Sequence, residues 1–554
     1  MKRGFVLLLL LVTWGCNKSD EPAPLPPAPP SNFTIKSWLI GDAESSTTNQ
    51  GISASPDIKL RFSTKVDRTS VASSISLAEN SGAPVNYTTT YENADSVVVI
   101  RPATPLSYLS LYKVNASTSL RSVEGGRLSS AFNTGFLTRI DSSRKFPAIS
   151  DDSLLTLVQK QTFRYFWDFA HPVSGLARDR TTSGDLVTSG GSGFGIMSIP
   201  VAVSRGFITR AQALSRMQTV VAFLKTAEKF HGAFPHFLNG VTGKVIPFST
   251  KDNGADLVET SFLMMGLLTA RQYFDGSDAA ETALRNEINT LYNGVEWSWF
   301  RKDNGSVLYW HWSPNYGWDM NLPIRGWNEC LVTYVLSAAS STYTIPATVY
   351  DNGWAGSGSS GFINGKSFYG YQLPLGPDYG GPLFFAHYSF LGVKPEGLTD
   401  KFANYKVQQV NHSQINYNYC KTNPLKYYGY SDSVWGLTAS DIPGGYTASS
   451  PTNDRGVIAP TAAVSSIPYT PTESMKAIKF FYYVLGDKLW GEYGFKDAFA
   501  LKDPWFASSY LAIDQGPMII MIENYRTGMV WDLFSSCPEV KAGMKKLGFS
   551  APYL

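Results

Sequence analysis

The spacing of apolar residues separates this 554-residue chain into two structurally different parts. From Asp151 onward, apolar residues recur at intervals of three and four, which is the period of an α-helix packed on one face. Several of these segments are apolar nearly all round, so both of their faces should be covered. The segments with this period are 153–170, 210–230, 257–274, 283–297, 327–340, 471–486 and 517–534.

Long loops rich in glycine and aromatic residues connect these predicted helices. Loops of this length inside a compact domain usually carry function. Helices alternating with such loops over residues 151–554 favour a double ring of helices, an (α/α)6 toroid, with the loops gathered at one end as a cleft. A helical solenoid is the structural alternative, but the sequence contains no fixed-period repeat that would support it.

Residues 32–140 have a different pattern, with short segments that alternate between apolar and polar residues. Such strands, evenly spaced and separated by turn residues, predict a β-sandwich. The stretches 55–67 and 97–114 resemble bacterial Ig-like modules. This part carries no catalytic constellation, so a spacer role is favoured and carbohydrate binding is the alternative. The predicted strands are 58–62, 75–79, 85–91, 96–102, 111–116 and 131–136.

The N-terminus has the features of an export signal. Lys2 and Arg3 precede an apolar run, residues 5–12, that is too short to span a bilayer. Residues 13–16, which end at Cys16, follow this run. The segment resembles a bacterial lipoprotein signal, which implies a lipidated thiol. An ordinary secretory peptide is the alternative. The acidic stretch 17–21 resembles the surface-export signal of Bacteroidetes lipoproteins.

These features predict four segments. Residues 1–16 form the signal peptide with the lipidated cysteine, and 17–31 form a proline-rich, extended linker. Residues 32–140 form the Ig-like β-sandwich, and 141–554 form the helical domain. We expect an outer-membrane lipoprotein, facing the periplasm or the cell surface, that touches the membrane through its lipid anchor only.

Composition excludes several functional classes. The net charge is +3 without any block of Lys or Arg, so no nucleic-acid partner is expected.

Cys330, Cys420 and Cys537 lie far apart in the sequence and predict buried free thiols rather than disulfides. The six histidines form no HExxH motif and no cluster with metal-ligand spacing, so neither a metal nor a cofactor is expected. A monomer is expected.

Several strings, in order along the chain, resemble the bacterial glucoamylase-like proteins of glycoside hydrolase family 144. They include TFRYFWDFAHPVSGLARDR, TSGGSGFGIMSIPVAVSRG, DLVETSFLMMGLLTARQYF, WHWSPNYGW, IRGWNE, GGPLFFAHYSFLG, DRGVIAPTAAVSSIPYTPTES and IDQGPMIIMIENYRTG. The resemblance implies an (α/α)6 fold and inverting hydrolysis of β-1,2-glucan to sophoro-oligosaccharides, mostly by endo action. The alternatives are an α-glucan hydrolase or a polysaccharide lyase on the same toroid, or a non-catalytic glycan-binding lipoprotein.

Inverting hydrolysis requires a carboxylic acid and a carboxylate base on opposite faces of the sugar, roughly 6.5–9.5 Å apart. Glu259 matches a carboxylate in the family's VETSF string and is the expected acid. Taken alone, Asp256 and Glu259 also fit a capping box that starts a helix. The expected base is Asp179 or Asp185, in the loop before the GGSGFG run, which we interpret as a tight turn into a helix. Asp454 is a reserve candidate, with a turn role or an ion pair to Arg455 as the alternative.

Substrate contacts are expected from a second set of residues. The aromatic residues of 310–327 are crowded between Gly, Pro, Ser and Asn, which favours stacking on sugar rings over a place in the core. Glu473 also fits a helix cap after Thr470 and Pro471, and a core position is as consistent with His387 as a ligand contact. The predicted binding residues are Trp310, His311, Trp312, Tyr316, Trp318, Trp327, Asn328, Glu329, His387, Arg455 and Glu473.

Overall fold

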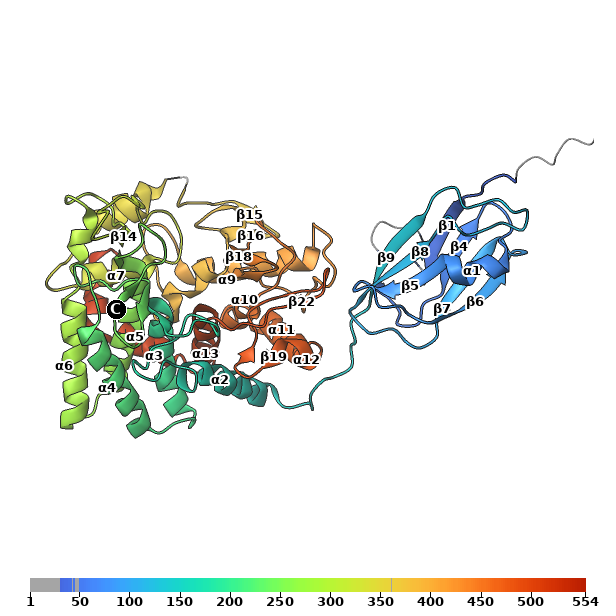
Figure 1. Ribbon diagram of the computed structural model, residues 1–554. Helices are drawn as coiled ribbons and strands as arrows, with labels where there is room; N and C mark the ends of the chain where they lie inside the picture. Colours follow the sequence, from blue (N-terminus) through green and yellow to red (C-terminus); the bar gives the residue numbers. More distant parts are fainter. Residues whose placement is uncertain (1–29, 42, 45–48, 360) are drawn as a thin grey trace, which may run out of the picture. The chain divides into compact units, whose positions relative to one another are not determined.

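The computed structural model describes residues 30–41, 43–44, 49–359 and 361–554, and these form two compact units (Figure 1). The first unit holds the described residues up to Ser107 together with Leu111–Thr138. The second holds Tyr108–Ser110 and Arg139–Leu554. The predicted signal peptide, its Cys16 and most of the predicted linker lie outside the described residues.

The first unit consists of two β-sheets and one short helix, α1 (Arg68–Ser74). One sheet has the strand order β2-β1-β4-β7-β6 and the other has the order β3-β9-β8-β5. Residues of both sheets, among them Ile58, Val98, Leu77 and Val114, meet in one apolar core. The strands are β1 (Ile35–Ile40), β2 (Ala43–Glu44), β3 (Asn49–Ile52), β4 (Ile58–Phe62), β5 (Ile75–Glu79), β6 (Tyr87–Glu92), β7 (Val97–Pro102), β8 (Leu111–Ala116) and β9 (Phe132–Thr138).

This unit confirms the predicted β-rich N-terminal part. The alternation of apolar and polar residues in the sequence becomes an alternation of buried and exposed side chains, as in β4, because successive side chains of a strand point to opposite faces.

The second unit is mainly helical, as predicted. Its helices are α2 (Asp151–Trp167), α3 (Ser189–Ser204), α4 (Arg210–Thr226), α5 (Leu257–Tyr273), α6 (Ala279–Asn293), α7 (Leu331–Ala339), α8 (Phe384–His387), α9 (Tyr405–Thr422), α10 (Pro460–Ser465), α11 (Pro471–Tyr483), α12 (Gly486–Leu489), α13 (Ala512–Arg526), α14 (Met529–Ser536) and α15 (Pro538–Lys546). Short 3-10 or π turns lie at η1 (Trp297–Arg301), η2 (Val349–Trp354), η3 (Gly356–Gly358), η4 (Asp378–Gly380) and η5 (Ser389–Leu391).

Short strands pair within the loops of this unit. The pairs that matter for the site are β13 with β14 and β17 with β18. The strands are β10 (Leu186–Thr188), β11 (Phe237–Asn239), β12 (Val245–Ile246), β13 (Ala255–Asp256), β14 (His311–Trp312), β15 (Ser367–Phe368), β16 (Tyr371–Gln372), β17 (Ala439–Ile442), β18 (Gly445–Ala448), β19 (Trp490–Gly491), β20 (Gly494–Phe495), β21 (Phe499–Ala500) and β22 (Trp505–Phe506).

The GGSGFG run forms the first turns of helix α3, not the tight turn that we predicted. Close packing of α3 against α5 explains the glycines. A Cβ added to Gly193 would lie 2.1 Å from the carbonyl oxygen of Phe262, and one added to Gly266 would lie 2.2 Å from the carbonyl oxygen of Gly193. Side chains at these positions would therefore separate the two helices.

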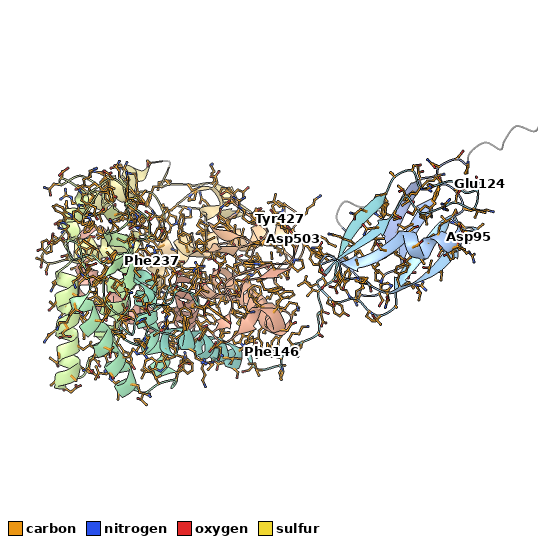
Figure 2. The ribbon with its side chains drawn as sticks, in the orientation of Figure 1. Asp95, Glu124, Phe146, Phe237, Tyr427 and Asp503 are labelled. Atoms are coloured by element: carbon orange, nitrogen blue, oxygen red, sulfur yellow. The ribbon has the colours of Figure 1, made fainter. Side chains whose placement is uncertain are left out.

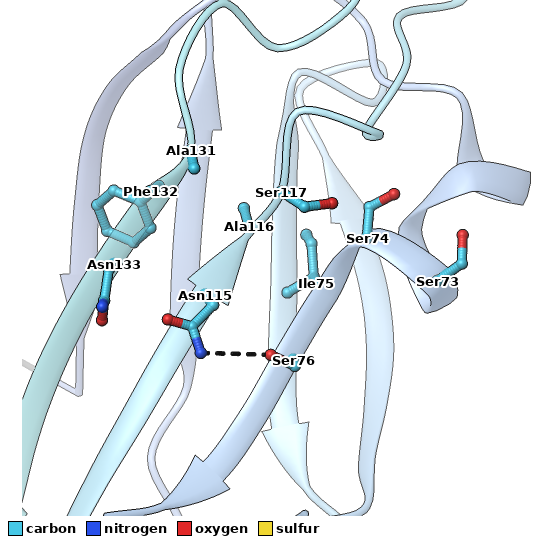
Figure 3. Close-up of a pocket in the computed structure, with 10 residues that line it drawn as sticks. All are labelled: Ser73, Ser74, Ile75, Ser76, Asn115, Ala116, Ser117, Ala131, Phe132 and Asn133. Carbon is cyan, nitrogen blue, oxygen red and sulfur yellow. Dashed lines mark hydrogen bonds between the residues drawn. The ribbon is translucent and has the colours of Figure 1, made fainter. Parts of the chain in front are cut away.

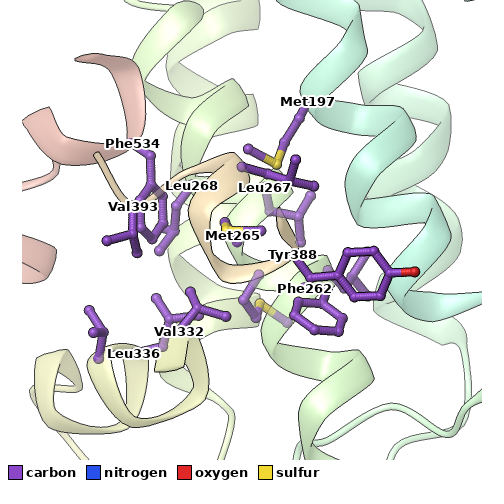
Figure 4. Close-up of a cluster of buried hydrophobic side chains, with 14 of the residues drawn as sticks. Met197, Phe262, Met265, Leu267, Leu268, Val332, Leu336, Tyr388, Val393 and Phe534 are labelled. Carbon is purple, nitrogen blue, oxygen red and sulfur yellow. The ribbon is translucent and has the colours of Figure 1, made fainter. Parts of the chain in front are cut away.

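The core of the helical unit lies around α5, most of whose side chains are buried. Figure 4 shows Met265 and Leu268 of this helix among apolar side chains from distant parts of the chain, including Val332 and Phe534. This packing fixes the axis of α5 and therefore the position of the side chains in its first turn.

Two differences from the predicted helices have physical causes. The predicted segment 517–534 is two helices, α13 and α14, because Gly528 between them adopts a left-handed conformation with φ 75°. Helix α9 was not predicted, because polar residues such as Gln408, His412 and Asn416 face its buried side. Buried hydrogen bonds replace apolar contacts there, so the helical period of apolar residues is absent.

The segment that enters the helical unit is attached along α11. Phe146, labelled in Figure 2, stacks on Tyr482 with ring centroids 4.6 Å apart. The backbone N–H of Lys145 donates to the carbonyl oxygen of Tyr483. Cys330, Cys420 and Cys537 are buried free thiols, as predicted. Across the described ranges, we find no helix with both the length and the apolar character needed to cross a membrane.

Candidate active site

Glu259 lies in the first turn of α5, where the helix begins at the pairing of β13 and β14. Its side chain is buried, and its Oε2 accepts hydrogen bonds from the backbone N–H of Gly190 at 2.7 Å and from the Thr188 hydroxyl at 3.3 Å. A Cβ on residue 190 would come within 2.5 Å of that oxygen. Glycine at 190 therefore allows the backbone of α3 to approach Glu259.

The capping prediction is half right. The Asp256 side chain accepts hydrogen bonds from the backbone N–H groups of Val258 and Glu259 and so caps α5. The Glu259 side chain instead points across to α3. A capping box needs the reciprocal hydrogen bond from the glutamate to the cap, so the capping box explains Asp256 but not Glu259.

The environment of Glu259 favours its protonated form. Burial raises the pKa of Glu259 above its usual value, and the nearby charges of Asp256 and Asp179 raise it further. His236 and the N–H of Gly190 oppose this shift in pKa. The net direction is the one that a general acid requires.

Two histidines and two aspartates surround the start of α5. The Nδ1 atom of His236 lies 3.1 Å from Oδ2 of Asp256, and the Nδ1 atom of His311 lies 3.4 Å from Oδ1 of Asp252. Burial lowers the pKa of His236, but the charges of Glu259 and Asp256 raise it to about 9. His236, Asp252 and Asp256 each offer a ligand atom, and these atoms lie within 4.8 Å of one another. The sequence spacing of these residues did not predict such a group.

Glu329 belongs to the same electrostatic group. Burial raises the pKa of Glu329 to about 7, and the charges of Glu259 and Asp256 act in the same direction. Its predicted partner in sugar binding, Asn328, has a structural role, since its side-chain oxygen accepts from the N–H of Cys330 at 3.0 Å and from the Trp354 indole at 3.2 Å.

The structure separates the two candidates for the base. Asp179 lies close enough for its charge to raise the pKa of Glu259, and Arg180 donates a hydrogen bond to it at 3.3 Å. Asp185 points elsewhere. Its side chain is 61% exposed and pairs with the ring of His171 at 3.2 Å. The geometry therefore favours Asp179 over Asp185.

Three further carboxylates, Asp441, Asp497 and Asp514, are linked to Asp179 through Arg180 and through one another. Sequence reasoning missed all three. Arg180 also donates to Asp441 at 3.0 Å, and the N–H of Asp441 donates to Asp497 at 2.7 Å. Burial raises the pKa of Asp497 to about 6 and the pKa of Asp514 well above its usual value, and the two carboxyl groups interact directly. The signal in the sequence was Asp514 itself, a lone acidic residue at the start of an apolar helix.

Two tyrosines lie among these acidic groups and were also missed. Burial raises the pKa of Tyr388 well above its usual value, and the charges of Asp514, Glu329 and Glu259 act in the same direction. Tyr446, on the β17–β18 hairpin, is 48% exposed, and the guanidinium of Arg180 lies 6.0 Å from its ring centre. An exposed ring beside Asp179 and Arg180 is a suitable platform for a sugar.

The predicted aromatic platform is only partly accessible. Tyr316 is 41% exposed, whereas Trp310, Trp312 and Trp318 are half-buried against the core. The prediction for Trp327 is wrong. It is 3% exposed and packs against other core rings, so it has no free face for a sugar.

Four predicted residues remain to be placed: His387, Asp454, Arg455 and Glu473. His387 is in the core, where its ring pairs with the Ser466 hydroxyl at 3.0 Å and burial lowers its pKa to about 3. This corrects the prediction of a ligand contact. Asp454 accepts hydrogen bonds from the N–H of Gly456 and from the Tyr430 hydroxyl, both at 2.8 Å, so it has the turn role.

The reserve assignment of Asp454 as a base stays a prediction. Burial raises the pKa of Asp454, and the hydrogen bonds from Gly456, Tyr430 and Tyr419 and the charge of Lys502 oppose this shift. Arg455 is exposed. Glu473 lies half-buried in the first turn of α11, where its carbonyl oxygen accepts from the Trp435 indole at 3.3 Å, and Thr470 makes no side-chain cap.

The first unit has a pocket of its own, with a volume of about 360 Å³ (Figure 3). Its lining mixes serine and asparagine side chains with apolar residues such as Ile75 and Phe132, and the amide of Asn115 donates to the Ser76 hydroxyl at 3.4 Å. This pocket contains no acidic residue, so it cannot perform the chemistry considered for Glu259.

Comparison with known proteins is consistent with this division. Residues 321–538 match the Glycoamylase family model ("Putative glucoamylase"), and residues 41–138 match a bacterial Ig-like domain, Big_5. A crystal structure of an endo-β-1,2-glucanase from Chitinophaga pinensis, in complex with sophorotriose and glucose, is 52% identical, with a TM-score of 0.72. The match covers 74% of this chain and 100% of that one.

The chain belongs to glycoside hydrolase family 144. A β-1,2-glucanase structure from Parabacteroides distasonis is 36% identical over 95% of this chain and 74% of that one, with a TM-score of 0.71. A curated relative from the same species, an exo β-1,2-glucooligosaccharide sophorohydrolase (non-reducing end), is 45% identical over 419 residues, which is 72% of this chain. The chain spans 58% of the length of that relative. The family membership predicted from the sequence strings is thus confirmed.

Proposed function

We propose that this protein is an inverting glycoside hydrolase that cleaves β-1,2-glucan to sophoro-oligosaccharides. The observation that carries the proposal is the 52% identity with the endo-β-1,2-glucanase from Chitinophaga pinensis. The match covers all of that enzyme's chain, and its structure holds sophorotriose and glucose. The buried Glu259 supports it, because its pKa is raised and a carboxyl group that keeps its proton can donate it to a leaving glycosidic oxygen.

In this proposal Glu259 is the general acid and Asp179 the general base. Arg180, held between Asp179 and Asp441, orients the base. Glu329 and the exposed ring of Tyr446 contact the sugar. The endo mode is favoured, because one relative that is matched over its whole length is an endo-β-1,2-glucanase.

The proposed scaffold is an (α/α)6 toroid. Helix α3 packs on α5 and on α13, α5 packs on α7, and α13 packs on α10, which is the pattern of neighbours in an inner ring. Helices α2, α4 and α6 alternate with them along the chain and pack on their outer sides. In a double ring, the first turns of α3, α5 and α13 then meet at one end, where Gly190, Glu259 and Asp514 lie.

The test is product analysis with a panel of glucans. Linear β-1,2-glucan should yield sophoro-oligosaccharides, and the first product should have the inverted anomeric configuration. Starch and β-1,3-glucan should remain intact. Cleavage of starch without cleavage of β-1,2-glucan would support the α-glucan alternative, and binding without any cleavage would support the non-catalytic one.

We also propose that the protein is a monomeric outer-membrane lipoprotein anchored through Cys16. The motive is the short apolar run, residues 5–12, that shortly precedes Cys16. Metabolic labelling with a fatty acid should mark the wild-type protein but not Cys16→Ala. Equal labelling of both proteins would contradict the lipid anchor.

A further inference from the structure

The structure brings two histidines and two aspartates together at the start of α5, from three separate stretches of the chain. The pairing of β13 with β14 places Asp256 opposite His311. Asp252 belongs to the turn before β13, and His236 lies directly before β11. Asp252, Asp256 and His311 are nine-tenths buried or more.

The distances between their polar atoms fit a small metal ion. In a tetrahedral zinc site the bonds are about 2.0–2.2 Å long, so the ligand atoms lie about 3.3 Å from one another. The distance from His236 Nδ1 to Asp256 Oδ2 is 3.1 Å, and His311 Nδ1 lies 3.4 Å from Asp252 Oδ1 and 3.8 Å from Asp256 Oδ2.

Hydrogen bonds alone do not complete this group. The buried Nδ1 of His311 has no hydrogen-bond partner among the described residues, although two carboxylate oxygens lie near it. One oxygen of Asp256 is already held by the backbone N–H groups of Val258 and Glu259, which leaves the other oxygen directed at the two imidazoles. This is the arrangement of a carboxylate prepared to bind a cation through one oxygen.

We propose that His236, Asp252, Asp256 and His311 form a structural site for a divalent cation of the zinc type. Two imidazoles and two carboxylates are a donor set that zinc accepts, whereas calcium and magnesium prefer oxygen ligands alone. Two carboxylates also balance the double charge of the ion. His236 is 25% exposed at its side chain, which gives the ion a path from solvent.

The ion would fasten the loop before β13, the strand β14 and the first turn of α5 to one another. It acts on the stability of the site and is not a reactant in the proposed hydrolysis. Binding to the folded protein alone stabilises it by mass action, so the melting temperature should rise with zinc concentration.

The experiment is a calorimetric titration of the tag-free full chain with Zn²⁺, after chelator treatment and without substrate. We expect one ion per chain and a higher melting temperature. Asp252→Asn and His311→Gln should weaken binding at least about tenfold, since each removes a ligand. The matched control is His231→Gln, which removes a histidine paired with Glu296 outside this group and should bind as the wild type does.

Two measurements keep the outcome clear. The melting temperature of each variant without zinc shows whether it folds, and Co²⁺ bound in place of zinc should give the strong visible absorption of a tetrahedral site. Absence of stoichiometric Zn²⁺ binding, or equal binding by Asp252→Asn and the wild type, would overturn the proposal. The glucan assay in the presence of chelator tests the proposed hydrolysis separately.

Discussion

The two units differ in where their charged side chains lie. In the β unit, the ion pairs lie on the surface, as between Lys59 and Glu92, whose side chains are 33% and 46% exposed. The core of that unit is apolar. The helical unit buries the carboxyl groups of Glu259, Asp497 and Asp514 almost completely.

Burial alone does not identify a functional carboxylate. Glu523 is also fully buried, but Arg205 donates two hydrogen bonds to it, and its pKa lies below its usual value even though burial opposes this. Glu259, Asp497 and Asp514 have raised pKa values. A buried acid whose pKa is raised costs stability at neutral pH, so its presence points to a role in chemistry.

The largest expected effect tests this distinction at Glu259. Glu259→Gln should lower the rate on β-1,2-glucan by about 10²–10⁴-fold, because glutamine keeps the shape but cannot donate the proton. The KM and the melting temperature should change little. A glycosyl fluoride, whose leaving group needs no acid, should restore turnover.

The control for this variant is Glu287→Gln, on the outer surface of α6, where Glu287 pairs with Lys225. It should leave the rate unchanged. Retention of more than about a tenth of the activity by Glu259→Gln would refute the assignment, since a general acid contributes more than that. Glu329, whose pKa is raised to about 7, would then be tested next as the acid.

The next effect compares the two aspartates of one loop. Asp179→Asn should reduce the rate on polymer by about 10²–10⁴-fold, and the fluoride substrate should not rescue it, because activation of water is lost. Asp185→Asn removes an exposed side chain that pairs with His171 and should reduce the rate much less. Equal losses in the two variants would contradict the choice of Asp179.

A smaller effect concerns stability and pH. The pKa of Asp497 is raised from 3.8 to about 6 in the folded protein. Between about pH 4 and pH 6, the folded state therefore keeps a proton that the unfolded state has lost. The free energy of unfolding should therefore fall as pH rises from about 4 to about 6. Asparagine does not ionise, so Asp497→Asn should prevent this fall in the free energy of unfolding. The variant should be more stable than the wild type at pH 8 by on the order of 1–3 kcal/mol.

The matched variant is Glu523→Gln, which breaks the buried pair with Arg205. It should destabilise the protein at pH 8, because it leaves a guanidinium without its partner. Denaturant titrations at pH 5 and pH 8 measure both variants. If both variants changed the free energy of unfolding in the same direction, the direction of the pKa shift would not distinguish functional from structural acids in this protein.

The smallest effect belongs to the β unit. Glu92→Gln removes an ion pair between exposed side chains, and such pairs contribute little because water and salt screen them. The melting temperature of the full chain should not change measurably at physiological salt. A clear loss of stability would show that the surface charges of this unit contribute to its fold.

Local patterns in the sequence predicted most of the longer helices and the strands β4 to β9 of the β unit. The two-residue period of 58–62 and the helical period of 257–274 reappear as β4 and α5, because each records which side chains face an apolar core. The same logic failed for α3 and α9. Glycines at a close helix contact and polar residues on a buried face remove the apolar period that identifies a helix.

For the site, the sequence by itself determined Glu259, through the string that surrounds it, and the acidic loop that contains Asp179. Only the tertiary structure decided which carboxylates meet. Arg180 links Asp179 to Asp441, which lies 261 residues further along the chain than Arg180. His311 lies next to Asp256 because the short strands β13 and β14 pair. Periodicity reports the environment of a residue within its own helix or strand. Contacts between distant segments depend on how helices and loops pack, and that packing also sets the burial that shifts each pKa.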